Sequence, residues 1–568
     1  MTSLIFPVRQ VVTCVHSSSS NWATTFALTV PKVYTFANSR GPIKSYTFGS
    51  KMQVVSGYYT LDFGIKNWLN INTTGRVDNL STLPDGNNTF FYPSVSVSSV
   101  ITDYAKLPEF ISFLKLRGSF ADVRGGLTNP TIGSSYQALT GSTVGSLLGG
   151  GTYGGYGSEL ISSYDGPSYD NQNAYNVTTY YNNTSSVDFS KNIASSSIKP
   201  FNVKSYEAGA DIKFMKNRLG AEFTYFTSIN GPIIYQLAVA PSTGYATQSV
   251  NAITSKKKGW ELSLNGTPIR TSRGFSWDVM LNVSTFKETL KEIYDGVTSL
   301  PINNHNYQVG ERLDGFYGRA YVRSPDGQII HDASGLPLAQ QAGINNNQLL
   351  GYANPDYVFG INNRFSYKNI SFSFQWDGRT GGKIFDYVYA QMFNAGNAME
   401  LVEGQYGDAR LKEWQSTNGG TINATGAMVG NGVVITSGTP HYTNGKIDNY
   451  DQLTFAPNAK AVTLRSYVQN GVYGLFDEPF MVNRSYLKLR EVVIGFSLPK
   501  KYLAKTFIRS ATFSLVGRNL LYFAERKDID LDQYASGFNL TNRTLSGKQS
   551  DLQSSTARRY GFNINIGF

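Results

Sequence analysis

The sequence has few charged residues and a single cysteine. Lys, Arg, Asp and Glu make up 16% of the 568 residues, against about 25% in typical globular domains. Because Cys14 is the only cysteine, no disulfide can form within the chain, and a cysteine-based metal cluster is excluded. No apolar run reaches the roughly 18 residues that a membrane-spanning helix needs. A closed β-barrel is still compatible with a membrane, because it satisfies every backbone group in lipid.

The first residues also lack the pattern of a secretory signal. Such a signal needs a basic start, an apolar stretch of about 7–15 residues and a small-residue cleavage site. In the opening MTSLIFPVRQVVTCVHSSSS, Arg9 interrupts the apolar residues, and Cys14 follows Val-Val-Thr, which is a poor lipoprotein acceptor site. We therefore expect that the chain as given carries no export signal.

Residues that would indicate catalysis, metal binding or nucleic-acid binding are also missing. The net charge is +11, but Lys and Arg are scattered, whereas nucleic-acid-binding proteins carry a basic stripe. The four histidines lack metal-ligand spacing, and no nucleophile elbow or Ser/His/Asp set is present. We predict no catalytic residues, no metal ligands, no cofactor and no nucleic-acid partner. Asp528, Asp530 and Asp532 alternate like calcium ligands without the Gly and distal Glu of an EF-hand loop, so calcium binding and a solvated loop both stay open.

What the chain does contain is aromatic residues and a two-residue alternation. Tyr, Phe and Trp make up 14% of it, and from about residue 52 to the end apolar and polar residues alternate, as in strands with one apolar face. We predict that the apolar face of the last segment contacts lipid and acts as the assembly signal. Its residues are Tyr560, Phe562, Ile564, Ile566 and Phe568. The segment Tyr486–Leu498 changes parity, which a β-bulge near Glu491 would explain, as would an upper half that leaves the lipid.

Short and long connections alternate between these segments. Three of the short ones contain Lys-Asn, and Asn tolerates the left-handed conformation of tight turns. They lie at 66–67, 216–217 and 368–369. The longest connections are 123–201, 288–355 and 380–484, and 230–252 is intermediate. Tight turns at one end and long loops at the other are typical of outer-membrane barrels. We therefore predict an all-β, antiparallel transmembrane barrel wall of thirteen strands, or fourteen with Thr24–Val30.

Several strings resemble the SusC/RagA family of TonB-dependent outer-membrane transporters. SYLKLREVVIGFSLPKKYL at 485–503 and ATFSLVGRNLLYF at 511–523 are similar to the family's penultimate hairpin, and RRYGFNINIGF is similar to its last strand. GWELSLNGTPI at 259–269 and PDYVFGINNRFSYKNISFSFQWDGRTGG at 355–382 are similar to other hairpins of the family. As an ordered set over about residues 52–568, these strings are specific to that family.

The resemblance implies a barrel of 22 strands around a plugged lumen, of which this chain would supply 13–14. A family member begins with a signal peptide, a TonB-contacting segment and a plug domain, none of which is recognisable here. We divide the chain into a poorly matching segment at 1–50 and the C-terminal part of a barrel at 51–568, and expect a truncated fragment. The resemblance also implies that the full-length protein lies in the outer membrane. There it would take up oligosaccharides or peptides with a SusD-like surface lipoprotein, driven by TonB through the plug.

Candidate substrate-binding residues fall in two places. Four tyrosines of the 123–201 loop could stack on sugars or pack on peptides, although they could equally pack the loop on itself. They are Tyr153, Tyr156, Tyr164 and Tyr169. Asp377 and Arg379 precede the Gly381-Gly382 pair at the extracellular rim, where a structural ion pair with a turn is the alternative to a substrate site.

Two other classes of protein are considered beside a transporter. A secreted or surface-exposed β-rich adhesin or carbohydrate-binding protein would show the same alternation but dissolve in buffer, whereas a barrel depends on detergent. A surface glycan-degrading enzyme is disfavoured, because the sequence shows no catalytic carboxylates in a recognisable setting.

Overall fold

The structure of the chain is a computed structural model. It describes residues 1–568 apart from 1, 6–9, 25–27, 42, 82, 126–174, 182–183, 190, 303–304, 340–346, 419–423, 444–445, 533–536, 540–543 and 547–555. Within these residues no helix is both long and apolar enough to cross a membrane.

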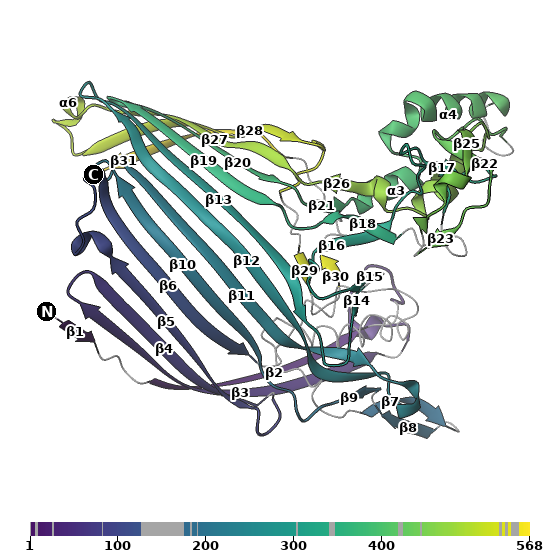
Figure 1. The fold of residues 1–568 in the computed structure, drawn as a ribbon, viewed down its shortest axis with the longest axis horizontal. Coiled ribbons are helices and arrows are strands. Elements are labelled where there is room, and N and C mark those ends of the chain that lie inside the picture. The colour runs from purple at the N-terminus through teal and green to yellow at the C-terminus, as the bar shows by residue number, and fades with distance from the viewer. Residues whose placement is uncertain are drawn as a thin grey trace.

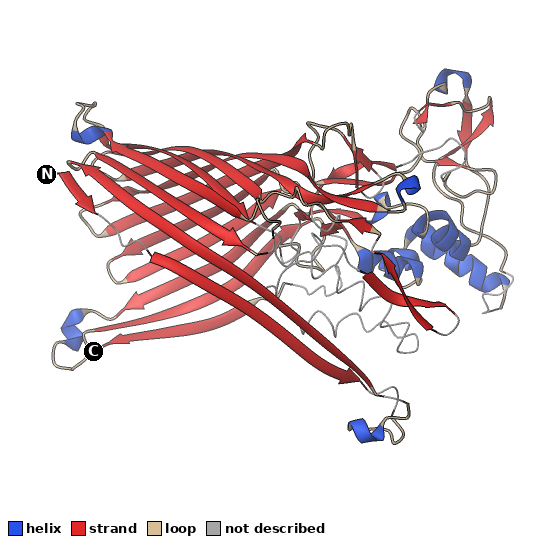
Figure 2. Ribbon diagram, turned by 90° about the horizontal axis from the view of Figure 1, so that it is seen from below, coloured by secondary structure: helices blue, strands red, loops and turns tan. Residues whose placement is uncertain are grey.

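One large antiparallel sheet forms a curved wall (Figures 1 and 2). Each strand pairs with its neighbours in chain order, apart from the small elements inserted in the loops. The wall strands are β1 (Thr2–Ile5), β2 (Gln10–Thr24), β3 (Lys44–Ile65), β4 (Leu69–Leu80), β5 (Thr89–Val100), β6 (Ile111–Gly125), β10 (Phe201–Phe214), β11 (Leu219–Ala238), β12 (Thr247–Arg270), β13 (Phe275–Glu292), β19 (Tyr357–Tyr367), β20 (Ile370–Thr380), β27 (Tyr486–Ser497), β28 (Ser510–Ala524) and β31 (Arg559–Gly567). This architecture confirms the predicted all-β antiparallel wall.

The fourteenth position in the wall is filled by a different segment from the one predicted. Both β1 and β2 pair with β3, with Thr2–Ile5 beside its last residues and Gln10–Thr24 beside its first. Strand β2 ends at Thr24. Of the predicted segment Thr24–Val30, residues 25–27 lie outside the described residues, and 28–30 belong to no wall strand. The sequence did not reveal β2 because its serine run at 17–20 interrupts the alternation. Its strand conformation comes from pairing with β3.

The three tight turns at 66–67, 216–217 and 368–369 lie at one end of the wall, with both chain termini and α6 (Lys500–Leu503) (Figure 1). In the turns at 66–67 and 368–369 the left-handed residue is lysine rather than asparagine, with φ 47° at Lys66 and 53° at Lys368. At 216–217 both residues are left-handed. The expected tight turns are therefore present, although Asn supplies the unusual conformation in only one of the three.

The long connections all lie at the opposite end (Figure 1). Three were expected, and a fourth joins β28 to β31. Their small strands are β7 (Tyr175–Tyr181), β8 (Thr184–Phe189), β9 (Asn192–Ile193), β14 (Leu300–Ile302), β15 (His305–Tyr307), β16 (Gly315–Arg319), β17 (Ile330–His331), β18 (Asn347–Tyr352), β21 (Lys383–Phe385), β22 (Val433–Ser437), β23 (Tyr442–Thr443), β24 (Lys446–Ile447), β25 (Thr454–Pro457), β26 (Met481–Asn483), β29 (Gly537–Asn539) and β30 (Thr544–Ser546). The helices of these connections, drawn blue in Figure 2, include α3 (Tyr387–Asn394), α4 (Gly404–Ser416) and α5 (Leu464–Ser466).

The connection expected at 230–252 is shorter than predicted. The strand β11 continues to Ala238 and β12 begins at Thr247. The extended strand ends bury Tyr235, Val250 and Ile253 in an apolar cluster with Leu290. This cluster explains why the chain there pairs as strand and does not form a loop.

The predicted bulge is present in β27. Gln375 of β20 pairs with Glu491, and the next residue, Trp376, pairs with Leu489. Arg490 is therefore the extra residue of the bulge and has no paired residue in β20. The extra residue lets Leu487 and Leu489 share the outer face with Val492 and the residues beyond it, in spite of their opposite parity. On that outer face Ile494 is 50% exposed. The bulge also turns the neighbours Arg490 and Glu491 toward the interior face, where both line one cavity.

Candidate functional site

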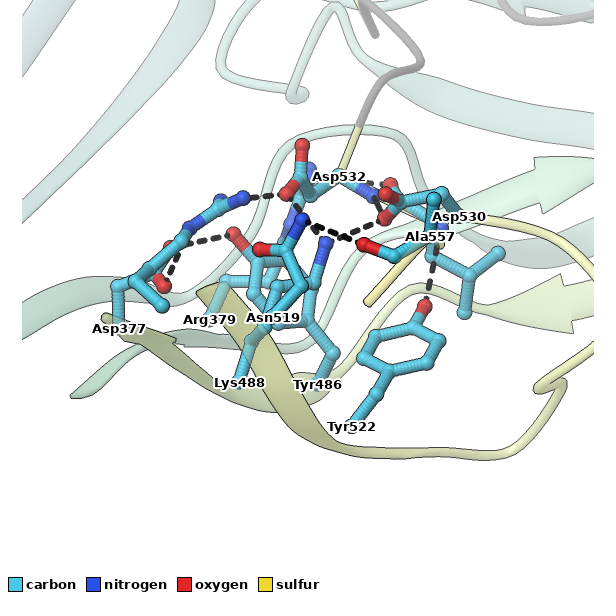
Figure 3. Close-up of polar contacts among 11 residues, drawn as sticks. Asp377, Arg379, Tyr486, Lys488, Asn519, Tyr522, Asp530, Asp532 and Ala557 are labelled. Carbon is cyan, nitrogen blue, oxygen red and sulfur yellow. Dashed lines mark hydrogen bonds and ion pairs between the residues drawn. The ribbon is translucent and has the colours of Figure 1, made fainter. Parts of the chain in front are cut away.

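A cluster of charged side chains lies on the interior face of β20, β27 and β28, toward the end with the long connections (Figure 3). Register places Asp377 directly opposite Lys488 and Arg379 opposite Tyr486. The Asp377 carboxylate accepts two hydrogen bonds from Arg490, at 2.6 and 2.8 Å, and one from the Tyr486 hydroxyl at 3.1 Å. A planar guanidinium that binds both carboxylate oxygens is the strongest form of this contact.

Lys488 is the most deeply buried charge of the cluster. Its side chain is 0% exposed, and its Nζ donates to Asp530 at 2.7 Å and to Asp532 at 2.8 Å. Arg490 forms a further ion pair with Asp532. Because a buried ammonium without a counter-charge costs several kcal/mol, these carboxylates are what allows a lysine at this position of the wall.

The two aspartates belong to the segment 525–532, which begins the connection between β28 and β31. Leu531 of this segment is fully buried and packs with Ile529 against Ile384 and Val482. Its carbonyl accepts from Arg379 at 3.0 Å, and its amide donates to the Tyr522 hydroxyl at 3.0 Å (Figure 3). The segment is therefore fixed to the wall by charge, by backbone hydrogen bonds and by apolar contact.

The same segment also contacts the helical part of the 380–484 connection. Arg526 forms ion pairs with Asp528 and with Asp386, and its guanidinium lies 4.6 Å from the Tyr389 ring centre. Asp386 caps α3 by accepting from the Tyr389 amide at 2.9 Å. Two long connections that are distant in sequence thus meet at Arg526.

The electrostatics of the aspartates follow from these partners. The hydrogen bond from Arg526 holds the pKa of Asp528 below its usual range. Burial raises the pKa of Asp530, but the hydrogen bond and charge of Lys488 outweigh burial, so that pKa is lowered. Lys488 is thus the partner of Asp530 and Asp532, and Arg526 is the partner of Asp528. Among the residues that the structure describes, no group of three or more His, Cys, Asp or Glu side chains is placed to hold a metal ion.

A cavity of about 280 Å³ lies beside the cluster on the same face. It is lined by Asp377 and Glu491, by Arg490, Arg518 and Arg559, and by the amides of Gln375 and Asn519. Arg518 donates to Glu491 at 2.8 Å. Asn519 has a left-handed backbone, with φ 53°, and its side chain donates to the Ala557 carbonyl.

The structure places the sequence-predicted residues as follows. Asp377 and Arg379 both belong to the charged cluster, but Asp377 pairs with Arg490 rather than with Arg379. Gly381 and Gly382 have φ of 74° and 84°, as the predicted turn requires. The four loop tyrosines Tyr153, Tyr156, Tyr164 and Tyr169 lie outside the described residues. The apolar side chains of β31 are exposed, from 77% at Tyr560 to 44% at Ile566, and Phe568 is 70% exposed.

Sequence reasoning missed Lys488 and Arg490, which are central to the cluster. The signal was present, because in SYLKLREVV both lie on the face opposite Leu487 and Leu489. Their partners could not be identified from sequence, since Asp530 lies 42 residues further along the chain.

Comparison with known proteins finds similarity to TonB-dependent receptors. No family model matches the sequence. The chain is 23% identical over 544 residues to TonB-dependent receptor P26 of Formosa agariphila, covering 91% of this chain and 46% of that protein. It is also 23% identical over 354 residues to TonB-dependent receptor P3 of the same organism, covering 58% of this chain and 30% of the relative. The chain thus spans less than half the length of these curated relatives.

Solved structures of similar fold include the RagAB peptide transporter. It matches with a TM-score of 0.60 and 14% identity, over 99% of this chain and 56% of that one. The "open-open" state of the RagAB peptide importer matches with a TM-score of 0.62 and 14% identity, over 99% of this chain and 55% of that one. The relatives are receptors and transporters, which are not enzymes. These findings agree with the resemblance seen in the sequence: the chain is similar to TonB-dependent receptors over 91% of its length and shares the fold of the RagAB peptide transporter.

Proposed function

We propose that this chain forms the C-terminal part of the barrel of an outer-membrane, TonB-dependent importer of the SusC/RagA type. The observation that carries the proposal is the topology of the wall, in which tight turns lie at one end and long connections at the other. In outer-membrane barrels the end with tight turns is periplasmic and the end with long loops is extracellular. The sequence relationship to TonB-dependent receptors supports the same function.

The wall needs further strands to work in a membrane. Among the described residues β31 pairs with β28 alone, and β1 and β2 pair with β3 alone. Each unsatisfied backbone group in lipid costs several kcal/mol, and strand number and tilt are linked in a closed barrel. We infer that the missing strands, together with a plug that responds to TonB, lie in the remainder of a longer importer, as the greater length of the relatives suggests.

The imported solutes would be oligosaccharides or peptides. Support for peptides comes from the fold of the RagAB peptide transporter. The long connections at the extracellular end would form the entrance to the barrel, and a SusD-like surface lipoprotein would cover it. Under this proposal the charged cluster fixes the position of two of those connections on the barrel wall.

Uptake and fractionation test the proposal together. The importer that contains this chain is expressed in a strain lacking it, with and without TonB, and growth on defined oligosaccharides and peptides is measured beside membrane fractionation. We expect the protein in the outer membrane and uptake that is lost without TonB. A buffer-soluble protein, or uptake that does not depend on TonB, would contradict the proposal. The soluble case would favour a secreted adhesin.

A further inference from the structure

Two arginines face each other across the last strand pair on the interior face of the wall. Arg518 of β28 is paired directly with Arg559 of β31, and Arg518 is paired on its other side with Glu491. Glu491 in turn pairs with Gln375. The four residues form one row across β20, β27, β28 and β31. Like charges directly opposite each other in a sheet are destabilising, so this row contains a repulsion that one carboxylate offsets only in part.

The charges around the row are unequal. Three arginines and two carboxylates line the cavity, but Arg490 and Asp377 already bind each other. That leaves Glu491 to neutralise both Arg518 and Arg559. The Arg518 side chain is 59% exposed and Glu491 is 37% exposed, so both are open to a solute. No carboxylate of the described residues forms an ion pair with Arg559.

We propose that this cavity binds a carboxylate group of the imported solute between Arg518 and Arg559. Guanidinium groups match the planar geometry of a carboxylate and bind it with paired hydrogen bonds. The amides of Gln375 and Asn519, which line the same cavity, would add donors. The bound anion would also remove the repulsion in the row. This inference rests on the proposed transport function and assigns the importer a preference for acidic solutes.

The carboxylate could come from a glycan or from a peptide, and matched probes separate these sources. The purified importer that contains this chain is titrated calorimetrically with trigalacturonic acid and with its methyl ester. A second pair of probes is a capped tri-glutamate peptide and its tri-glutamine equivalent. We expect the acidic member of at least one pair to bind more tightly than its neutral partner, with an affinity that falls as salt is added.

The variants Arg518→Gln and Arg559→Gln, singly and together, test the residues themselves. We expect the double variant to lose about tenfold or more in affinity for the acidic probe, the loss expected for one charge-assisted hydrogen bond, with neutral probes unaffected. The control is Arg364→Gln on β19, an interior arginine opposite Asp278. It removes the same charge from the wall outside the cavity, and should leave binding unchanged.

Several results would overturn the site. Equal binding of acidic and neutral probes would do so, as would unchanged affinity in the double variant. An acidic residue on an adjoining strand could instead hold Arg559. In that case Arg559→Gln would weaken the heat-modifiable barrel on gels without any selective loss of acidic probes, which also overturns the proposal. TonB-dependent uptake of neutral solutes would persist in all of these cases, so failure of the site is distinguishable from failure of the transport function.

Discussion

The wall and the 380–484 connection place their apolar side chains in opposite ways. In the wall the large apolar residues point outward and stay exposed, as Phe372 (38%), Phe496 (45%) and Phe562 (70%) show. In the connection, by contrast, Phe393 and Phe480 are only 3% and 1% exposed. They belong to a buried cluster that includes Leu401 and Val472. The connection therefore has a buried apolar core of its own. The difference indicates that the wall relies on lipid to cover its apolar face, while the connection folds around its own core.

The region around the start of β27 differs again, because it buries charged side chains. Lys488 and Arg484 are each 0% exposed. Burying charge adds little stability by itself, but breaking a buried ion pair costs a great deal. The interior cluster therefore fixes geometry, and the core of the connection supplies stability.

The largest effect is expected from removing the buried charge. Lys488→Met leaves Asp530 and Asp532 without their common partner, and removing one member of a buried ion pair costs about 3–5 kcal/mol. We expect segment 525–532 to detach from the wall, which faster hydrogen exchange and protease cleavage there would report. The exposed Lys501→Met in α6 is the control. Equal protection of the segment in both variants would show that charge does not hold it.

An effect of comparable size, but more local, is expected in the apolar core of the connection. The Phe480 ring contacts those of Phe385, Tyr389, Phe393 and Tyr473. Phe480→Ala should cost about 3–5 kcal/mol by leaving a cavity, and we expect it to loosen α3 and η7 (Tyr467–Tyr473) while the barrel still inserts. Hydrogen exchange of the connection, beside the heat-modifiable gel shift of the barrel, measures both. Loss of the barrel itself would mean that the two regions are not independent.

The outward face of the wall provides the third test. Phe372→Arg should destabilise insertion by about 2–4 kcal/mol if the site lies near the middle of the bilayer. Ser373→Arg, one residue along β20 and on the other face, should be tolerated far better. Outer-membrane levels of the two variants give the comparison. Similar losses in both would contradict a lipid-exposed face.

The comparison also explains which parts of the structure could be predicted. Alternation and turn placement suffice for the wall, because each strand repeats one local rule. The bulge followed from the parity change between Leu489 and Val492. The ion pairs of Lys488 did not, because they depend on how a loop 42 residues away packs. Asp528, Asp530 and Asp532 resembled calcium ligands because carboxylates spaced by two look the same in the sequence whether a metal or a basic side chain binds them.

The most direct test of the account is a scan of labelled cysteines along β20 in the folded importer, in a Cys14→Ser background. Labels at Ile370, Phe372 and Phe374 should be quenched by brominated lipid. Labels at Ser371, Ser373 and Gln375 should be quenched by iodide from the aqueous side. We predict this alternation over all six positions. Aqueous quenching at every position, in a protein that needs no detergent, would contradict the membrane barrel and favour a soluble β-protein.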